Sequence, residues 1–453
     1  MEKIKVSVIL PSLNVAKYIR KCLESVVCQT LREIEIICVD GGSADGTTEI
    51  ISEFAARDSR IVVIHADKKS YGYQVNLGMD AAQGKYVGIV ETDDYILSNM
   101  YESLYRVAED TGVDTVKSDW VQFYDDAENG EKVRVNLHCD LSYYSRVIRP
   151  RSEKVCFYLP LSTWNGVYRR DFLRKHNIRH NESSGASYQD NGFYFQTMAY
   201  AESVYLLRDA FYMLRRNNPN SSIVNTGNMH RILGEFHFMK ALLGKDEYLY
   251  KNFRYEFGYL LVQNGQWLFE RMLYNDRKEF LYKFVSELKD AIADDCIDYG
   301  CFEDRHLVFL FKLLHNLPQY MDREIGDIGL LQRAIAEKKR IFIYGLKNRG
   351  RDFLYEVQGR FPYARVQGFV VSKRNPGETL YCGQKVYELS ELSGTAKDSL
   401  FIIAVRTDKV RKEIAENLRG LGFDNILCVA WQYFWHMYMH GAQSYMLLKK
   451  YEE

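Results

Sequence analysis

Three carboxylates lie within four residues of one another, at Glu91, Asp93 and Asp94, directly after a short apolar run. Because like charges this close repel one another, the group favours a compensating cation. Carboxylate oxygens are hard ligands that suit Mn²⁺ or Mg²⁺, and such an ion can bridge protein carboxylates to a substrate diphosphate. The alternative is a solvated turn in which Asp94 caps the helix that follows. The cluster alone predicts either a metal-assisted diphosphate site or a capped turn.

A second polar segment, residues 40–47 with the sequence DGGSADGT, also follows an apolar run and precedes a helical pattern. Its glycines and short polar residues permit tight turns that leave backbone N–H groups facing outward. Asp40 could accept a hydrogen bond from the imino N–H of a pyrimidine base. The alternative is a capped turn in which Asp45 or Thr47 serves the helix.

These segments follow strands in a pattern that alternates short apolar runs with amphipathic stretches. Such alternation predicts an α/β fold with a mostly parallel sheet and helices on both faces. Ligands of such sheets bind beyond the carboxyl ends of the strands, so the polar residues there should share one rim. The predicted strands are 6–10, 34–39, 61–64 and 86–90, and the predicted helices are 15–28, 47–56 and 73–82.

Four segments taken together resemble the family 2 glycosyltransferases of the GT-A fold. They read VSVILPSLN, IICVDGGSADGT, NLGMDAAQGKYVGIVETDDY and, at residues 185–193, GASYQDNGF. The resemblance covers about residues 4–222 in the expected order. It implies inverting transfer of a sugar from a nucleotide-diphosphate donor, with a UDP-sugar favoured, to an acceptor hydroxyl. The pathway it implies is bacterial cell-surface polysaccharide or lipopolysaccharide synthesis.

The resemblance also assigns roles to residues of this chain. Asp190 becomes the candidate catalytic base, and Asp93 with Asp94 become the ligands of Mn²⁺ or Mg²⁺ and of the diphosphate. The sequence departs from the family at Leu13, where many relatives have Tyr, and at Gln189, where Glu is usual. The candidate nucleotide-binding residues are Pro11, Leu13, Asn14, Asp40, Glu91 and Asp93.

Three further residues are candidates for the acceptor side or for a lid. Trp164 is expected to stack on the apolar face of a sugar, or else to be a buried core residue. Arg215 and Arg216 are expected to close over the diphosphate as cations on a mobile loop, or else to be surface arginines.

The rest of the chain predicts further parts beyond a GT-A domain at residues 1–224. Residues 225–335 have helical spacing, and residues 336–430 return to the strand–helix pattern of a smaller Rossmann-like domain. Lys347 occupies the middle position of its glycine turn, which argues against a dinucleotide site. This part resembles small domains that precede some sugar acyltransferases, and we expect a binding or docking role or a structural one. Residues 431–453 predict an amphipathic tail helix.

The composition of the 453-residue chain limits the classes of partner that it is expected to bind. Lys plus Arg and Asp plus Glu both number 60, so no long-range field favours a nucleic acid. The sequence lacks an apolar stretch that could span a bilayer, and its nine cysteines form no CxxC pair, which together favour a cytoplasmic protein. The acceptor is expected to be a saccharide or a lipid-linked saccharide. A lipid-linked acceptor would place the protein peripherally at the cytosolic face of the inner membrane.

Two other functions fit parts of the pattern. A nucleotidyltransferase that makes a nucleotide sugar also needs a metal and a carboxylate at a strand end, but its glycine-rich, basic N-terminal loop is missing from this sequence. A non-catalytic protein that binds nucleotide sugars would have no need of a base, so the presence of Asp190 beside Asp93 and Asp94 argues against it.

Overall fold

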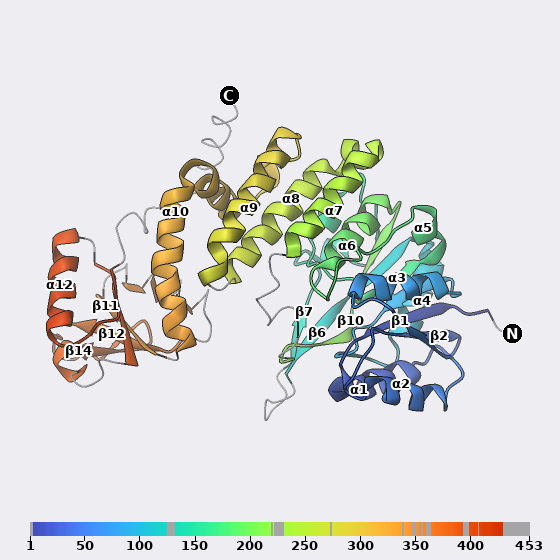
Figure 1. Cartoon of the computed structure of the whole chain (residues 1–453), viewed down its shortest axis with the longest axis horizontal. Coiled ribbons are helices and arrows are strands. Elements are labelled where there is room, and N and C mark those ends of the chain that lie inside the picture. The colour runs from blue at the N-terminus through green and yellow to red at the C-terminus, as the bar shows by residue number, and fades with distance from the viewer. Residues whose placement is uncertain are drawn as a thin grey trace. The chain divides into compact units, whose positions relative to one another are not determined.

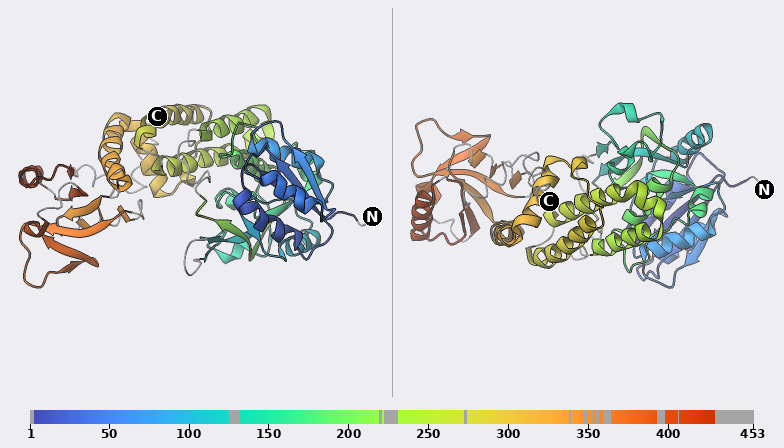
Figure 2. Two further views of the ribbon diagram at one scale, coloured as in Figure 1. Left: turned by 60° about the horizontal axis from the view of Figure 1, so that its bottom comes forward. Right: turned by 90° about the horizontal axis from the view of Figure 1, so that it is seen from above.

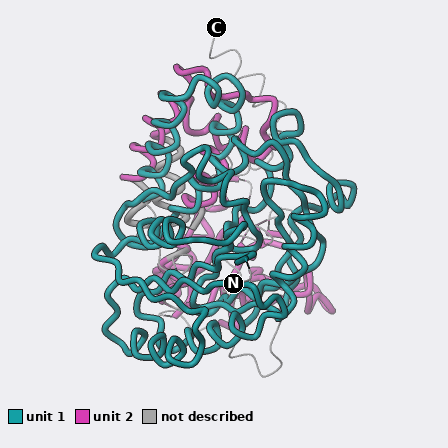
Figure 3. Tube along the Cα trace, turned by 90° about the vertical axis from the view of Figure 1, so that its right-hand side faces the viewer, with its two compact units in different colours: residues 1–260 teal, residues 261–453 magenta. Residues whose placement is uncertain are grey.

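The computed structural model divides the chain into two compact units, residues 1–260 and residues 261–453 (Figure 3). Each unit is described here by itself. The structure describes residues 3–428 with the exception of 125–131, 219–220, 222–230, 272–273, 338, 347–349, 352, 355–356, 359–363, 393–397 and 406.

Half of the sheet in the N-terminal unit is parallel. Three of its strands are buried along their whole length, as expected for a sheet that is covered on both faces, whereas the edge strand at residues 61–65 is only partly buried. The strands lie in the order β3-β2-β1-β4, which are Ile61–His65, Ile34–Asp40, Val6–Ser12 and Tyr86–Ile89. This arrangement confirms the predicted mostly parallel α/β fold.

Helices cover both faces of this half. Figure 1 shows α1 (Ala16–Val27) and α2 (Thr47–Ala55) together on one side of the sheet, and α3 (Tyr71–Ala81) with α6 (Gln189–Tyr200) on the other. Helix α3 packs closely on β1, since a Cβ at Gly78 would lie 2.5 Å from Cγ2 of Ile9.

The other half of the sheet mixes parallel and antiparallel strands, which the local pattern did not predict. Strand β10 pairs in parallel with β6 and antiparallel with β5. The sheet continues from β4 through β9 (Gly166–Arg169), β6 (Thr115–Phe123) and β10 (Val204–Arg215) to β5 (Tyr95–Ile96), with α4 (Met100–Thr111) packed beside it. This order brings the end of β10 alongside the segment that carries the three carboxylates.

The predicted helical segment forms long helices. Helix α7 spans Ile232–Lys245, α8 spans Glu247–Arg271, α9 spans Tyr274–Ala293 and α10 spans Asp304–Ala336. Within the N-terminal unit, the start of α8 packs on the sheet domain through the ring of Phe253, whose centroid lies 5.4 Å from that of Phe157. The boundary between the two units falls inside α8, at residues 260 and 261, and the domain limit predicted after residue 224 lies outside the described residues.

The C-terminal unit contains a second, smaller sheet (Figure 2). Its faces carry separate apolar clusters, one completed by Leu331 and Ala334 of α10 and the other by Ala415 and Leu418 of α12 (Asp408–Gly420). The strand order is β13 (Leu380–Tyr381), β14 (Gln384–Glu388), β12 (Val366–Val371), β11 (Arg340–Tyr344), β15 (Ser399–Ile403) and β16 (Ile426–Cys428), and all pairs except β13 with β14 are parallel. This is the predicted Rossmann-like arrangement.

Two other expectations concern the C-terminal unit and the membrane. Lys347 and the predicted tail helix at residues 431–453 lie outside the described residues. Across the part of the chain that is described, no helix is both long enough and apolar enough to cross a bilayer.

Candidate active site

The carboxyl ends of β1, β2 and β4 are joined by hydrogen bonds into one rim. The hydroxyl of Thr92 donates to the carbonyl oxygen of Pro11 over 2.9 Å. The N–H of Gly41 donates to the carbonyl oxygen of Ser12 over 2.8 Å. The three polar segments therefore meet at one edge of the sheet, as their positions in the sequence predicted.

Asp40 organises the loop that follows β2. Its buried carboxylate accepts hydrogen bonds from the hydroxyls of Ser43 (2.6 Å) and Thr48 (3.0 Å). Asn14 lies at φ +53° and its side-chain oxygen accepts from the N–H of Ala44, so the loops after β1 and β2 form one surface. A contact between Asp40 and a base stays a prediction.

Asp45 joins the starts of α1 and α2, but the N-cap of α2 is Gly46 without a side-chain cap, so the alternative in which Asp45 or Thr47 caps this helix is wrong. The Asp45 carboxylate accepts from the N–H and hydroxyl of Thr47, at the start of α2, and from the N–H of Ala16, at the start of α1. Leu13 is half-buried at the same rim.

Asp94 is buried, and both of its carboxylate oxygens are engaged by the protein. One oxygen accepts from the hydroxyl of Tyr212 (2.8 Å) and the other from the N–H of Arg215 (2.7 Å). Burial raises the pKa of Asp94 well above its usual range, and the nearby charge of Asp93 adds to the effect. The alternative in which Asp94 caps a helix is wrong, because α4 begins at Met100 with Asn99 as its N-cap.

Asp93 is half-buried, and one of its carboxylate oxygens accepts a hydrogen bond from the side-chain amide of Asn218 over 2.7 Å. Among the described residues, no group of three or more His, Cys, Asp or Glu side chains is arranged to hold a metal ion. An ion at Asp93 would therefore take other ligands from the substrate, which is how Mg²⁺ is commonly held beside phosphates. The carboxylates present fit such an ion.

Residues 91–94 form the acidic segment, and Glu91 connects this segment to two tyrosines. Its backbone N–H donates to the hydroxyl of Tyr212 (3.0 Å), and its carboxylate accepts from the hydroxyl of Tyr71 (2.5 Å). Burial, together with the charges of Asp93 and Asp190, raises the pKa of Glu91 to about 8. Asp190, which lies about a hundred residues later in the sequence, is therefore close enough to act on this carboxyl electrostatically.

Asp190 is positioned by contacts between its loop and the start of α3. The N–H of Tyr71 donates to the carbonyl of Gly185 (2.9 Å), and the N–H of Gly185 donates to the carbonyl of Lys69 (2.8 Å). Asp190 itself is half-buried in the first turn of α6, and burial raises its pKa. The N-cap of α6 is Tyr188, so Asp190 is not the residue that caps this helix.

Gln189 explains the shape of this loop. Its side-chain N–H₂ donates to the hydroxyl of Ser183 and to two backbone carbonyls, and its side-chain oxygen accepts from the N–H of Ser187 (2.6 Å). A glutamate at this position would lose the donors, so the glutamine matches its surroundings.

Trp164 lies beside the acidic segment and is neither fully buried nor free to reorient. Its ring stacks on Tyr212, with centroids 4.2 Å apart, and meets the edge of Trp120 at 5.3 Å. It is half-buried, so one alternative, a fully buried core residue, is wrong, and stacking on a sugar stays a prediction.

The expectation of a mobile cationic lid is wrong for Arg215. This residue is the last of β10 and is only 5% exposed. Its Nε donates to the carbonyl oxygen of Asp93 (2.6 Å), and its guanidinium lies over the rings of Tyr18 and Phe123. Arg216 follows the strand and is half-buried, and its role toward a diphosphate stays a prediction.

The structure adds site residues that the local sequence pattern did not indicate. Tyr212 lies inside an apolar strand, and nothing in the surrounding sequence indicates that its hydroxyl belongs to the site. Tyr71 opens a helix, and Asn218 precedes a proline in a segment noticed only for its arginines. Each is joined to the acidic segment by a long-range hydrogen bond.

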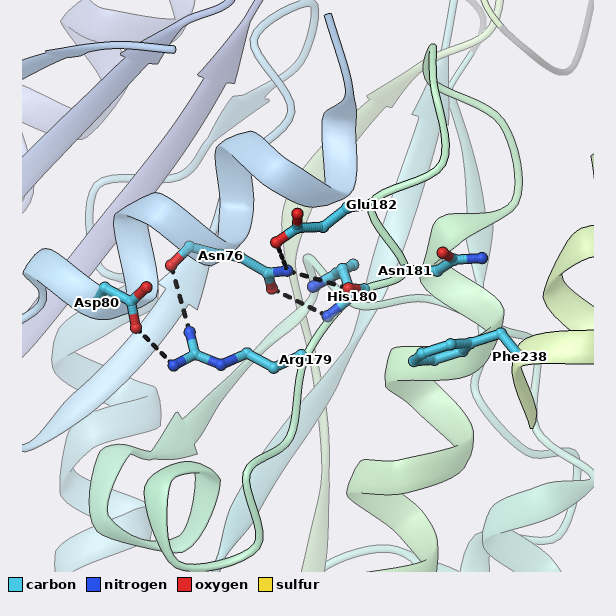
Figure 4. A pocket seen from close by; sticks show the side chains of 7 residues that line it. All are labelled: Asn76, Asp80, Arg179, His180, Asn181, Glu182 and Phe238. Atoms are coloured by element: carbon cyan, nitrogen blue, oxygen red, sulfur yellow. Dashed lines mark hydrogen bonds and ion pairs between the residues drawn. The ribbon is translucent and has the colours of Figure 1, made fainter. Parts of the chain in front are cut away.

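A cavity of about 410 Å³ lies on the α3 side of the same unit (Figure 4). Arg179 spans it to form an ion pair with Asp80, and the side-chain amide of Asn76 donates to Glu182. Its lining residues are Asn76, Asp80, Arg179, His180, Asn181, Glu182 and Phe238.

Comparison with known proteins shows which family part of the chain is similar to. The sequence profile described as "Glycosyl transferase family 2" matches residues 7–176. This segment of the chain is therefore similar to a family 2 glycosyltransferase domain. The matched region holds the whole of the rim from Pro11 to Asp94, whereas Asp190 and Tyr212 lie beyond it.

Individual relatives match different shares of the chain. The uncharacterized glycosyltransferase EpsJ of Bacillus subtilis is 31% identical over 219 residues, which cover 48% of this chain and 62% of EpsJ. The cholesterol galactosyltransferase of Borreliella burgdorferi is 26% identical over 344 residues, which cover 71% of this chain and 92% of that protein. Among solved structures, S. aureus TarS 1-349 in complex with UDP-GlcNAc matches with a TM-score of 0.42 at 19% identity, covering 63% of this chain and 89% of TarS 1-349.

Proposed function

We propose that this chain transfers a sugar, with inversion, from a nucleotide-diphosphate donor to an acceptor hydroxyl, and that the donor is a UDP-sugar. The observation that carries the proposal is the convergence of Asp190 with the acidic segment at the strand-end rim. Similarity to the family and the names of the relatives, which include a galactosyltransferase, support the same reaction class.

The proposed reaction is a single displacement. The acceptor oxygen attacks the anomeric carbon of the donor, and the bond from that carbon to the β-phosphate oxygen breaks, so that the nucleoside diphosphate leaves with the electron pair. Asp190 takes the proton from the acceptor hydroxyl. A base must lie close to the nucleophile. The influence of the Asp190 charge on Glu91 supports this role, because it brings Asp190 to the acidic segment.

Enzymes of this family generally use a divalent metal ion. When bound, Mn²⁺ or Mg²⁺ neutralises charge on the departing diphosphate. Asp93 is the residue we assign to hold it, because its carboxylate reaches the partly exposed rim. Asp94 is buried with both oxygens occupied, so we assign it to fix the acidic segment in place.

We assign the nucleotide to the surface formed by the loops after β1 and β2. Pro11, Leu13 and Asn14 form one side of this surface, and Asp40 stands at the end of β2 to meet the base. We assign Glu91 to the ribose or the sugar, because the charge of Asp190 acts on its carboxyl group and its backbone lies in the same acidic segment as Asp93.

For the acceptor we propose a saccharide or a lipid-linked saccharide in the assembly of a bacterial surface polysaccharide. Trp164 offers a half-exposed ring for a sugar, and Arg216 offers a cation near the diphosphate. A lipid-linked acceptor would place the protein at the cytosolic face of the inner membrane. The Rossmann-like domain is assigned a docking or binding role.

The proposal is tested by a thermal-shift screen of UDP, GDP, CDP and dTDP with and without Mn²⁺. We expect UDP with Mn²⁺ to raise the melting temperature most, because a ligand that binds only the folded state stabilises it by mass action. Calorimetric titration of the Asp93→Ala variant should show weak binding. Binding by this variant that equals wild-type binding and ignores Mn²⁺ would contradict the metal assignment.

Product analysis separates the alternatives. A glycosyltransferase releases UDP from a UDP-sugar, a nucleotidyltransferase exchanges pyrophosphate into the nucleotide sugar, and a non-catalytic binding protein does neither. Pyrophosphate exchange without UDP release would contradict the proposed reaction.

A further inference from the structure

Helix α7 contacts the segment that carries Asp190, residues 181–192, through one buried carboxyl group. Glu235 is 1% exposed, and its two oxygens accept hydrogen bonds from the side-chain amide of Asn181 (2.7 Å) and from the N–H of Gly192 (3.3 Å). These two donors lie on either side of Asp190 in the sequence. One carboxyl group therefore holds the segment both before and after the proposed base.

Helix α7 with its N-cap residue and this segment approach each other closely at two glycines. Gly185 lies at φ +87°, and a Cβ there would overlap with Nη1 of Arg231, which donates to the carbonyl of Ser184 (2.8 Å). A Cβ at Gly192 would lie 2.5 Å from the ring of Phe238. The two glycines permit a close approach of helix and segment that larger residues would prevent.

Glu235 is also coupled to Asp190 electrostatically. Burial, together with the charge of Asp190, raises the pKa of Glu235 to about 8. The groups that face the Glu235 carboxyl are Asn181 from the preceding loop and Gly192 and Asp190 from α6. Figure 4 shows Asn181 and Phe238 near each other on the α7 side of the cavity.

We propose that Glu235 is a positioning residue for the transfer reaction, which holds Asp190 in place through Asn181 and Gly192. This inference rests on the proposed function, in which Asp190 is the base. Glu235 touches neither the rim nor the acidic segment through any of the contacts given above, so its loss should leave donor binding intact. A misplaced base slows the chemical step, and a displacement near 1 Å can cost about 100-fold in rate.

The test compares Glu235→Gln with Glu256→Gln. Glu256 is a buried glutamate of α8 in the same unit, and its carboxylate lies 3.5 Å from Nζ of Lys154. In Glu235→Gln one N–H of the new amide must face either Asn181 or Gly192, which breaks one of the two holds. The activity measured is UDP release from an equimolar mixture of UDP-glucose, UDP-galactose and UDP-N-acetylglucosamine with Mn²⁺.

We expect Glu235→Gln to lower kcat by about 10- to 100-fold, with UDP affinity by calorimetry within about threefold of wild type. The Glu256→Gln control should stay within about threefold in both quantities. Unchanged kcat in Glu235→Gln, an equal loss of kcat in Glu256→Gln, or a parallel loss of UDP affinity would overturn the inference.

A double-mutant cycle shows whether Glu235 acts through Asp190. In the Asp190→Asn background, adding Glu235→Gln should lower the slow residual rate by less than about threefold, because the group it positions is already inactive. A further tenfold fall would mean that Glu235 acts elsewhere. If Asp190→Asn alone keeps normal activity, the assignment of Asp190 as the base is wrong. That outcome is distinct from a failure of Glu235→Gln to lower kcat, which would contradict the positioning role of Glu235.

Discussion

At the scale of single residues, one phenol hydroxyl holds the acidic segment together. The hydroxyl of Tyr212 accepts from the N–H of Glu91 and donates to the buried carboxylate of Asp94, so it serves both ends of the segment. Asp93, between them, is thereby turned toward the rim. The ring of Tyr212 is in turn covered by Trp164.

Removing this hydroxyl should destabilise the protein. Tyr212→Phe leaves a buried carboxylate and a buried N–H each short of one hydrogen bond, which should lower the free energy of unfolding by about 1 to 3 kcal/mol. Urea unfolding measures the change. The matched control is Tyr101→Phe, since the buried hydroxyl of Tyr101 has no partner among the described residues and its loss should be nearly neutral. Equal effects of the two variants would contradict the role of Tyr212.

Asp190→Asn should lower turnover by a factor of about 10² to 10⁴ and spare donor binding. The substitution keeps the shape of the side chain but removes its capacity to accept a proton, and a positioned base contributes about 10² to 10⁴ in rate. UDP release and UDP calorimetry measure the two quantities separately. Because Tyr188 and not Asp190 is the cap of α6, the fold should tolerate the change. Activity within about threefold of wild type would remove Asp190 from the mechanism.

At the scale of elements, the sequence predicted the parallel half of the sheet and not the mixed half. Strands β1, β2 and β4 are apolar runs followed by polar turns, and such a local pattern is enough to predict a strand. Strand β10 alternates less regularly, and its register shifts against β6 between Leu207 and Tyr212. Its place beside β5 depends on contacts between residues that are more than a hundred positions apart in the sequence, and a local pattern cannot predict such contacts.

The same distinction holds for the candidate site. Asp40, Asp93, Asp94 and Asp190 stand at predictable positions, after strands or at the start of a helix. The residues that orient them reach in from distant elements. Arg215 shows the consequence: its sequence neighbours suggest a surface loop, whereas strand pairing buries it under the rim.

Strand β6 carries a buried lysine that should make stability depend on pH. Nζ of Lys117 donates to the carbonyl of Ser162 (2.6 Å), in the loop that leads to Trp164, and burial lowers the pKa of Lys117 to about 7 from its ordinary 10.5. Between these values the unfolded chain binds the proton and the folded chain does not. The free energy of unfolding should therefore rise with pH across this window, by at most about 1.4 kcal/mol per unit.

Lys117→Met tests this linkage. Urea unfolding of wild type and variant at about pH 7 and about pH 9 should show a smaller rise in the variant, because the titrating group is gone. An identical rise in both proteins would show that Lys117 keeps its proton in the folded state.

At the scale of the whole molecule, the candidate site lies entirely within the N-terminal unit. Deleting residues 337–453 should therefore leave the affinity for UDP and Mn²⁺ within about threefold of the full chain. The cut uncovers Leu331 and Ala334, which pack in the core of the second sheet, so binding is best measured on the monomeric fraction. Loss of UDP binding in a truncated protein with native circular dichroism would place part of the site in the C-terminal unit.

The most direct test of the account is UDP release by the full-length protein. We expect UDP to be released from one of the three UDP-sugars in the equimolar mixture when Mn²⁺ is present, and faster when a saccharide acceptor is added. The rate of release should fall by at least about 100-fold in Asp93→Ala and in Asp190→Asn. Release that persists in both variants, or that occurs equally with the metal removed by chelation, would contradict a metal-assisted transfer at this rim.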